Sequence, residues 1–176
     1  MEINLKIDRV IVGLLNTNCY ILSIGKYCIV IDPGDEYDKI KPFLSNKEVI
    51  AIIITHYHFD HIGALEYFDS NKVLDIRNLE EKNYNIGPFY FNVIYTLGHK
   101  EDCITIYFEK EKIMFTGDFI FKNSIGRTDL AGGNDNDMIN SINKIKKYDA
   151  DIVIYPGHGD KTILGDELIN LDSKIE

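Results

Sequence analysis

Residues 50–61 read IAIIITHYHFDH, an apolar run followed at once by three histidines and one aspartate. The run at residues 49–54 is rich in β-branched side chains and has the length of a strand buried on both faces of a sheet. The residues from 61 to 68 then carry apolar side chains in a helical pattern. The histidine cluster is therefore predicted to lie on a loop between a buried strand and a helix.

The rest of the chain reads as a mixture of short strands and helices. Further strands are expected at residues 3–12, 18–23, 27–31, 72–74, 89–95, 103–108, 113–116 and 151–155. Further helices are expected at residues 36–44, where Pro42 would shorten or kink the helix, after Asn134, and at 166–171. Strict βαβ alternation is absent, and no GxGxxG follows the first strand. This pattern favours an α/β protein with two mixed sheets over a doubly wound fold.

Length and composition limit the classes of partner. The chain has 176 residues, of which 45% are hydrophobic and 27% charged, and these values are typical of a single globular domain spanning residues 1–176. Its net charge of −9 would repel a phosphate backbone. We therefore expect a small-molecule partner and no nucleic acid.

Cysteine usage and hydropathy indicate a cytoplasmic location. The three cysteines, Cys19, Cys28 and Cys103, form no CxxC pair and each lies in or beside an apolar run, so we expect reduced, buried thiols. The first residues lack the apolar core of a signal peptide, and no apolar run approaches the ~20 residues of a membrane span. A membrane partner is not expected.

All five histidines fall on predicted loops. His99 and His158 each follow a glycine at the end of a predicted strand, and Asp118 follows Gly117 in the same way. A single loop histidine is most often a surface or hydrogen-bonded residue. Strand ends that deliver several nitrogen and oxygen donors beside an HxHxDH loop indicate instead a metal site at a sheet edge.

The number of donors predicts two ions. Five imidazoles and two carboxylates, Asp60 and Asp118, are too many for one tetrahedral zinc. Because residues two apart in an extended segment share a face, His56 and His58 are expected to bind one ion. Asp60 and His61 point differently and suit a second ion. A carboxylate has two oxygens, so Asp118 is the natural bridge.

The pattern HxHxDH followed by His99, Asp118 and His158, together with Asp32-Pro33-Gly34, resembles the metallo-β-lactamase superfamily. The resemblance implies an αβ/βα sandwich of two mixed β-sheets with helices on the outer faces. It also implies two divalent metal ions, with zinc expected and iron or manganese as alternatives. The implied ligands are His56, His58 and His99 for the first ion, Asp60, His61 and His158 for the second, and Asp118 for both. Asp32 would orient the ligand loop by hydrogen bonds.

Within that superfamily, residues 117–130 and 157–162 resemble the glyoxalase II-like hydrolases, without the helical C-terminal domain that holds glutathione. This branch implies hydrolysis of a hydroxyacylglutathione-type thioester by a metal-bridging hydroxide. Asp60 would be a catalytic residue that both ligates metal and orients this hydroxide. Arg127 could contact substrate carboxylates or form a surface salt bridge. True β-lactamases of this type usually carry cysteine at the position of Asp118, which counts against antibiotic hydrolysis.

Two other functions compete with this hypothesis. A persulfide dioxygenase of similar sequence would bind a single iron through His56, His99 and Asp118; Cys103 weakly favours it, and His158 between two glycines disfavours it. A non-catalytic protein braced by metal is the alternative of another class. Structural zinc sites are usually closed by four ligands, often thiolates, whereas this set contains carboxylates and no obvious cysteine ligand.

Overall fold

The structure, a computed structural model, describes residues 4–172. The first sheet contains five strands in the order β1-β2-β3-β4-β5. Its strands are β1 (Lys6–Val12), β2 (Thr17–Ile24), β3 (Tyr27–Ile31), β4 (Glu48–Ile53) and β5 (Val73–Leu74). The pairs β1–β2 and β2–β3 are antiparallel, whereas β3–β4 and β4–β5 are parallel. The sheet is therefore mixed.

The second sheet contains six strands in the order β13-β12-β9-β8-β7-β6. Its strands are β6 (Asn83–Ile86), β7 (Phe89–Tyr95), β8 (Ile104–Phe108), β9 (Ile113–Gly117), β12 (Val153–Pro156) and β13 (Thr162–Ile163). Only β9 and β12 pair in parallel, so this sheet is mixed as well. A separate small hairpin is formed by β10 (Ile120–Phe121) and β11 (Ser124–Ile125).

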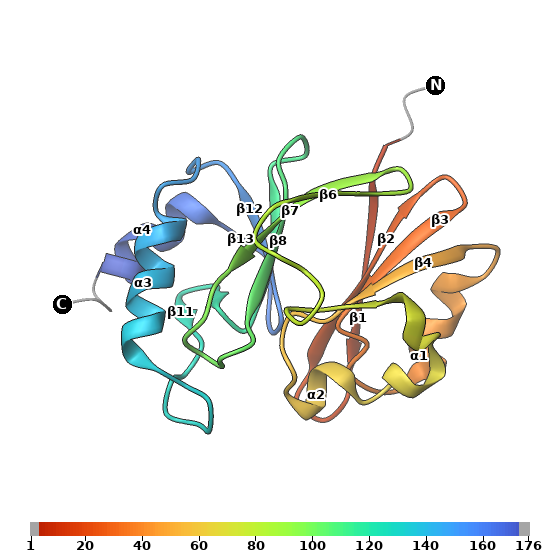
Figure 1. The fold of residues 1–176 in the computed structure, drawn as a ribbon, viewed down its shortest axis with the longest axis horizontal. Coiled ribbons are helices and arrows are strands. Elements are labelled where there is room, and N and C mark those ends of the chain that lie inside the picture. Colours follow the sequence, from red (N-terminus) through yellow and green to blue (C-terminus); the bar gives the residue numbers. More distant parts are fainter. Residues whose placement is uncertain (1–3, 173–176) are drawn as a thin grey trace.

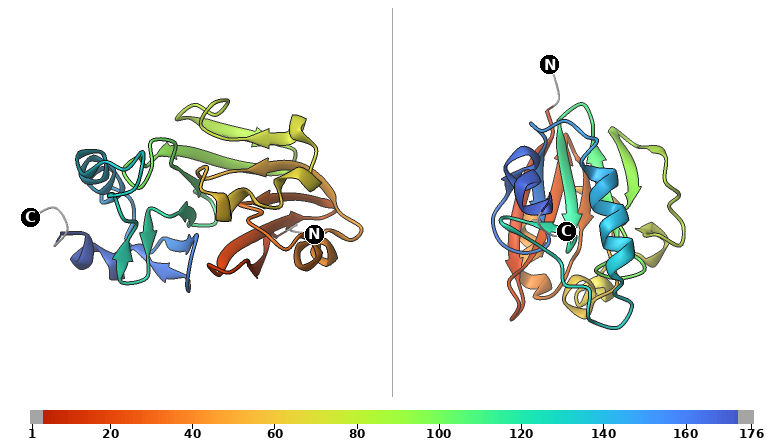
Figure 2. Two further views of the ribbon diagram at one scale, coloured as in Figure 1. Left: turned by 90° about the horizontal axis from the view of Figure 1, so that it is seen from below. Right: turned by 90° about the vertical axis from the view of Figure 1, so that its left-hand side faces the viewer.

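Helices lie on the outer sides of the two sheets (Figure 1). On one side are α3 (Asp135–Ile145) and α4 (Leu164–Asp172), and on the other are α1 (Tyr37–Ile40) and α2 (Phe59–Ile62). Short 3₁₀ turns follow at Lys41–Leu44, Leu65–Tyr67 and Ser70–Lys72. The two turned views show the same layering (Figure 2). No helix among residues 4–172 has the length and hydropathy needed to cross a bilayer.

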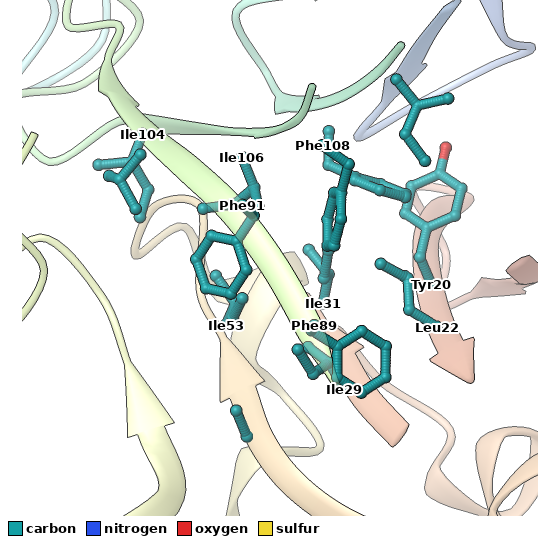
Figure 3. Close-up of a cluster of buried hydrophobic side chains, with 14 of the residues drawn as sticks. Tyr20, Leu22, Ile29, Ile31, Ile53, Phe89, Phe91, Ile104, Ile106 and Phe108 are labelled. Carbon is teal, nitrogen blue, oxygen red and sulfur yellow. The ribbon is translucent and has the colours of Figure 1, made fainter. Parts of the chain in front are cut away.

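Alternation along the strands produces three apolar layers. In β2, Tyr20 and Leu22 face the other sheet, whereas Cys19 and Ile21 face the side of α1. The layer between the sheets combines aliphatic side chains of the first sheet with phenylalanines of the second, among them Phe89, Phe91 and Phe108 (Figure 3). A third layer lies between the second sheet and α3 with α4. The sandwich is thus filled without any contribution from the histidine cluster.

The predicted architecture of two mixed sheets with outer helices is confirmed, and so is the helix after Asn134. The Asn134 side chain caps α3 by accepting a hydrogen bond from the Asp137 N–H at 3.0 Å. Pro42 does shorten the first helix, because the chain continues as a 3₁₀ turn from Lys41. Residue 3, where the first strand was expected to begin, lies outside the described residues.

The prediction of one helix over residues 61–68 was wrong. α2 begins earlier, at Phe59, and ends at Ile62, and a separate 3₁₀ turn follows at Leu65–Tyr67. The cause is close packing at Gly63, where an added Cβ would lie 2.3 Å from the Gly34 carbonyl oxygen. The next residue, Ala64, donates its N–H to the Pro33 carbonyl instead of continuing the helix. The short strands β6, β10, β11 and β13 were not predicted, because so few residues give no clear periodicity.

Candidate metal centre

The structure brings all seven predicted ligand residues to one edge of the sandwich. Four strand ends supply them: β4 precedes the HxHxDH loop, and β7, β9 and β12 precede His99, Asp118 and His158. Because β9 and β12 are parallel neighbours, Asp118 and His158 emerge at the same edge. Asp60 and His61 lie in the first turn of α2.

Three imidazole nitrogens and one carboxylate converge as a first group. His58 Nδ1 lies 3.1 Å from His56 Nε2 and 2.9 Å from His99 Nε2. Asp118 Oδ2 lies 3.6 Å from His99 Nε2 and 3.9 Å from His56 Nε2. Tetrahedral zinc bound to nitrogen at ~2.0–2.1 Å requires ligand atoms about 3.3 Å apart, and the observed distances bracket this value. The first group therefore suits one ion.

A second group adjoins the first through Asp118. His61 Nε2 lies 3.4 Å from Asp60 Oδ2 and 3.3 Å from Asp118 Oδ1. His158 Nε2 lies 3.2 Å from Asp60 Oδ2 and 3.4 Å from Asp118 Oδ2. Asp118 thus lies within 4 Å of inward nitrogens in both groups.

Two buried polar atoms at the centre have no hydrogen-bond partner among the described residues. They are His61 Nε2 and Asp118 Oδ1. Unpaired buried polar atoms are unfavourable unless something else satisfies them. The absence of a side chain on Gly157 keeps the space beside Asp118 free, because an added Cβ would lie only 2.3 Å from Asp118 Oδ1. The donor set and the unpaired atoms both fit a divalent cation.

The outward nitrogens of three imidazoles are held by other parts of the chain. His61 Nδ1 donates to Asp32 Oδ2 at 2.8 Å, and His99 Nδ1 donates to the Arg127 carbonyl at 2.7 Å. His158 Nδ1 donates to the Leu15 carbonyl at 3.1 Å. Each bond leaves Nε2 facing inward, and in the neutral ring this is the nitrogen that binds a metal.

Asp32 lies beneath the ligand loop. Its Oδ1 accepts the Thr55 N–H at 2.8 Å and its Oδ2 accepts the Thr55 hydroxyl at 2.6 Å, in addition to the bond from His61. Thr55 Oγ1 in turn lies 3.1 Å from His56 Nδ1. One buried carboxylate therefore orients a ligand from each of the two groups.

Sequence reasoning missed several residues that support the ligands. Thr17 donates its hydroxyl to Asp60 Oδ2 at 2.8 Å, and Asp102 accepts the Tyr57 N–H at 3.0 Å. The Tyr57 hydroxyl donates to buried Asp75 at 2.7 Å, and this fixes the residue between His56 and His58. No sequence signal marks these contacts, because their partners are distant in the chain.

Arg127 uses its side chain and its backbone differently. The guanidinium forms a two-bond pair with Asp129, at 2.7 Å for each bond, and both side chains are exposed. The carbonyl accepts the bond from His99 described above. The surface salt bridge that the sequence analysis gave as the alternative role of Arg127 is therefore present, with Asp129 as its partner.

The cysteines take no part in the centre. All three are free and buried, as expected, and burial raises the pKa of the Cys103 thiol well above its usual value. A buried thiol with a raised pKa is a poor nucleophile and a poor ligand.

The two groups differ in proton affinity. Burial, and then the charge of His61, hold the pKa of His56 well below its usual value. Burial opposes protonation of His61 too, but the charge of Asp32 and the nearby Asp118 carboxylate raise its pKa to about 10. Burial is likewise outweighed at His158, where Asp118 and Asp60 raise the pKa to about 9. At neutral pH His61 and His158 of the second group are protonated, whereas His56 of the first group is neutral.

We expect metal binding at the second group to depend more steeply on pH. A metal ion must displace the protons of His61 and His158, so the affinity for the second ion should rise by up to about 100-fold per pH unit between pH 7 and 9. Binding of the first ion should release fewer protons, because His56 is already neutral. Calorimetric zinc titrations in buffers of different ionisation enthalpy measure the protons released. Equal release for both ions would contradict this prediction.

Comparison with known protein families gives a consistent result. The sequence profile of the metallo-beta-lactamase superfamily matches residues 12–95 and 86–158. "Probable metallo-hydrolase YqgX" of Bacillus subtilis (strain 168) is 31% identical over 194 residues, covering 90% of this chain and 92% of that protein. "Hydroxyacylglutathione hydrolase" of Francisella philomiragia subsp. philomiragia is 35% identical over 156 residues, covering 79% of this chain and 61% of that protein.

Two solved structures resemble more than nine tenths of this chain. The crystal structure of BLEG-1 B3 metallo-beta-lactamase superposes with a TM-score of 0.87 at 30% identity, covering 93% of this chain and 97% of that one. The crystal structure of TTHA1623 in a di-iron-bound form superposes with a TM-score of 0.80 at 29% identity, covering 91% and 96%.

Proposed function

The chain belongs to the metallo-beta-lactamase superfamily and has its fold, and we propose that it is a dinuclear metallohydrolase that cleaves thioesters of the hydroxyacylglutathione type. The position of Asp118 between the two donor groups is the observation that carries the dinuclear hypothesis. The similarity to a hydroxyacylglutathione hydrolase supports the choice of substrate. A cytoplasmic location, with no nucleic-acid or membrane partner, remains part of the proposal.

The centre has a buried side and an accessible side. His56, His61, His99 and Asp118 are buried, whereas His58, Asp60 and His158 are partly exposed. Substrate would therefore approach over the last three residues. When bound, the two ions would lower the pKa of a water molecule and polarise the acyl carbonyl.

Asp60 is the residue to which we assign the orientation of the attacking water. Burial opposes its ionisation, but His158 and the charge of His61 hold its pKa below the usual range, so it is a carboxylate at neutral pH. Thr17 occupies one of its oxygens with a hydrogen bond, which fixes the direction of the carboxylate. An ionised and fixed acceptor of this kind can hold a water molecule in one orientation.

The rival functions fit the centre less well. A persulfide dioxygenase with one iron on His56, His99 and Asp118 would leave His61 Nε2 buried and unpaired. A protein in which metal serves only as a brace needs no accessible side, yet three donors reach solvent. β-Lactam hydrolysis is a further candidate, because of the 30% identity to BLEG-1 B3 metallo-beta-lactamase.

The test is thiol release from S-lactoylglutathione by metal-replete protein, measured beside β-lactam hydrolysis and persulfide-dependent oxygen uptake. Thiol release with two ions per chain would support the proposal. One iron per chain together with oxygen uptake would overturn it in favour of the dioxygenase. Hydrolysis of the β-lactam without thiol release would replace the substrate class and keep the dinuclear mechanism.

Arg127 remains our proposed contact for a substrate carboxylate, reached by exchanging its surface partner Asp129. We expect Arg127→Ala to raise KM for S-lactoylglutathione by about 10-fold, with metal content unchanged, because the backbone bond to His99 survives the substitution. Lys26→Ala is the control for loss of an exposed positive charge, since this lysine pairs with exposed Glu48 and contacts no residue of the centre. An unaltered KM in Arg127→Ala would rule out the contact.

A further inference from the structure

Three large apolar side chains are exposed at one place beside the second donor group. Leu14 is 100% exposed, Phe59 is 75% exposed and Leu15 is 51% exposed. All three line a cavity of about 320 Å³ between the β1–β2 turn and the start of α2. None of them belongs to the three apolar layers of the fold. They are therefore available to a ligand at no cost to the core.

This apolar surface, formed by Leu14, Leu15 and Phe59, is continuous with the candidate centre. Asp60 lines the same cavity, and Phe59 precedes it directly in the chain. The Leu15 carbonyl accepts the hydrogen bond from His158 Nδ1 at 3.1 Å. A substrate bound over Asp60 and His158 would lie next to these side chains.

The β1–β2 turn that presents the two leucines is held in place at both ends. Gly13 donates its N–H to Glu36 at 2.8 Å and accepts the Asn16 N–H at 3.2 Å. Thr17 forms an isolated bridge with His158. The leucines are thus displayed from an ordered turn, so a ligand meets a preformed surface and loses less free energy in ordering it.

We propose that this apolar surface is the subsite for the acyl group of the substrate, and that the preferred thioesters carry an apolar acyl chain. The inference rests on the proposed function. With the carboxylates of the thiol portion directed to Arg127, beside His99, the acyl portion extends the other way, over Asp60. Hydrolysis breaks the C–S bond, forms a C–O bond from water, and yields a carboxylic acid and a thiol. Each methylene of the acyl chain that the leucines bury should raise the affinity for the substrate by about four-fold.

The test compares S-hexanoylglutathione with S-lactoylglutathione on metal-replete protein. We expect wild-type kcat/KM to be at least about 10-fold higher for the hexanoyl substrate. Leu14→Ser should lower the hexanoyl-to-lactoyl ratio by about 10-fold, and Phe59→Ser should lower it too, each with wild-type metal content. Ile169→Ser is the matched control, because this apolar residue is 81% exposed on α4, outside the cavity lining.

The possible results distinguish failure of the acyl subsite from failure of the proposed thioesterase function. Hydrolysis of both substrates at similar rates, with a ratio that Leu14→Ser does not change, overturns the acyl subsite and leaves the thioesterase function standing. A ratio that falls equally in Ile169→Ser also overturns it. Failure to hydrolyse either thioester overturns the proposed function and the subsite together. The measured metal content excludes a trivial loss of ions in the variants.

Discussion

Asp118→Asn is expected to lower kcat/KM for thioester hydrolysis by about 1,000-fold or more and to reduce the metal content from two ions towards one. Its carboxylate lies within 4 Å of both donor groups, with 3.6 Å to His99 Nε2 and 3.3 Å to His61 Nε2. An amide keeps the shape but loses the negative charge and one acceptor oxygen. The remaining neutral oxygen is a weaker metal ligand than a carboxylate, so we expect asparagine to hold only one of the two ions.

The fold should survive this substitution. Asp118 lies at the edge of the second sheet, and the three apolar layers do not include it. Asp151→Asn is the matched control, since Asp151 is exposed and its only described partner is Lys112 on the surface. Metal analysis, circular dichroism and kinetics on the two variants measure the effect. An Asp118→Asn protein that keeps two ions and a tenth or more of wild-type activity would refute the bridge.

The donors were predictable from the sequence because each one carries a side-chain signal. The HxH spacing places His56 and His58 on one side of an extended segment, and the structure brings their inward nitrogens within 3.1 Å. A glycine at the end of a predicted strand precedes each of His99, Asp118 and His158, and this pattern can be recognised in the sequence alone. The fold class was predictable for a similar reason, since buried strands produce long apolar runs.

Apart from Asp32, the residues that support the donors were not predictable. His99 and His158 are oriented by the backbone carbonyls of Arg127 and Leu15, and any residue could supply a carbonyl. Thr17 and Asp60 are 43 residues apart in the chain, so only the folded structure shows their contact. The end of α2 at Ile62 was missed because it depends on the packing of Gly63 against Gly34, a tertiary contact that overrides the local apolar pattern.

The second large effect is expected from removing the metal. Chelated protein should have no measurable hydrolase activity but should stay folded at neutral pH, and added zinc should restore the activity. The sandwich core contains no metal ligand, so its apolar layers persist without the ions. A protein that is merely braced by metal would instead unfold on chelation.

The charges at the centre explain why the fold should tolerate removal of the ions. Asp32, Asp60 and Asp118 lie together, and in metal-free protein the protonated imidazoles of His61 and His158 offset them. The pKa values of about 10 and about 9 keep both rings protonated at pH 7. Because these pKa values are raised above the unfolded value, the stabilisation is full below about pH 6.5 and is lost as the pH rises towards 10.

Thermal unfolding of metal-free and zinc-loaded protein at pH 7 and pH 9.5 tests this account. Zinc at ~100 times its Kd should stabilise the fold by about 2.7 kcal/mol per site, which corresponds to a rise in Tm of roughly 5–10 °C for a domain of this size. The metal-free protein should lose stability between the two pH values, because His61 and His158 lose the protons that offset the carboxylates. The zinc-loaded protein should lose less, because the ions supply that positive charge at both pH values. Metal-free protein that is unfolded at pH 7 would show that the centre is structural, and metal-free stability that does not fall at high pH would show that the two imidazoles do not compensate the carboxylates.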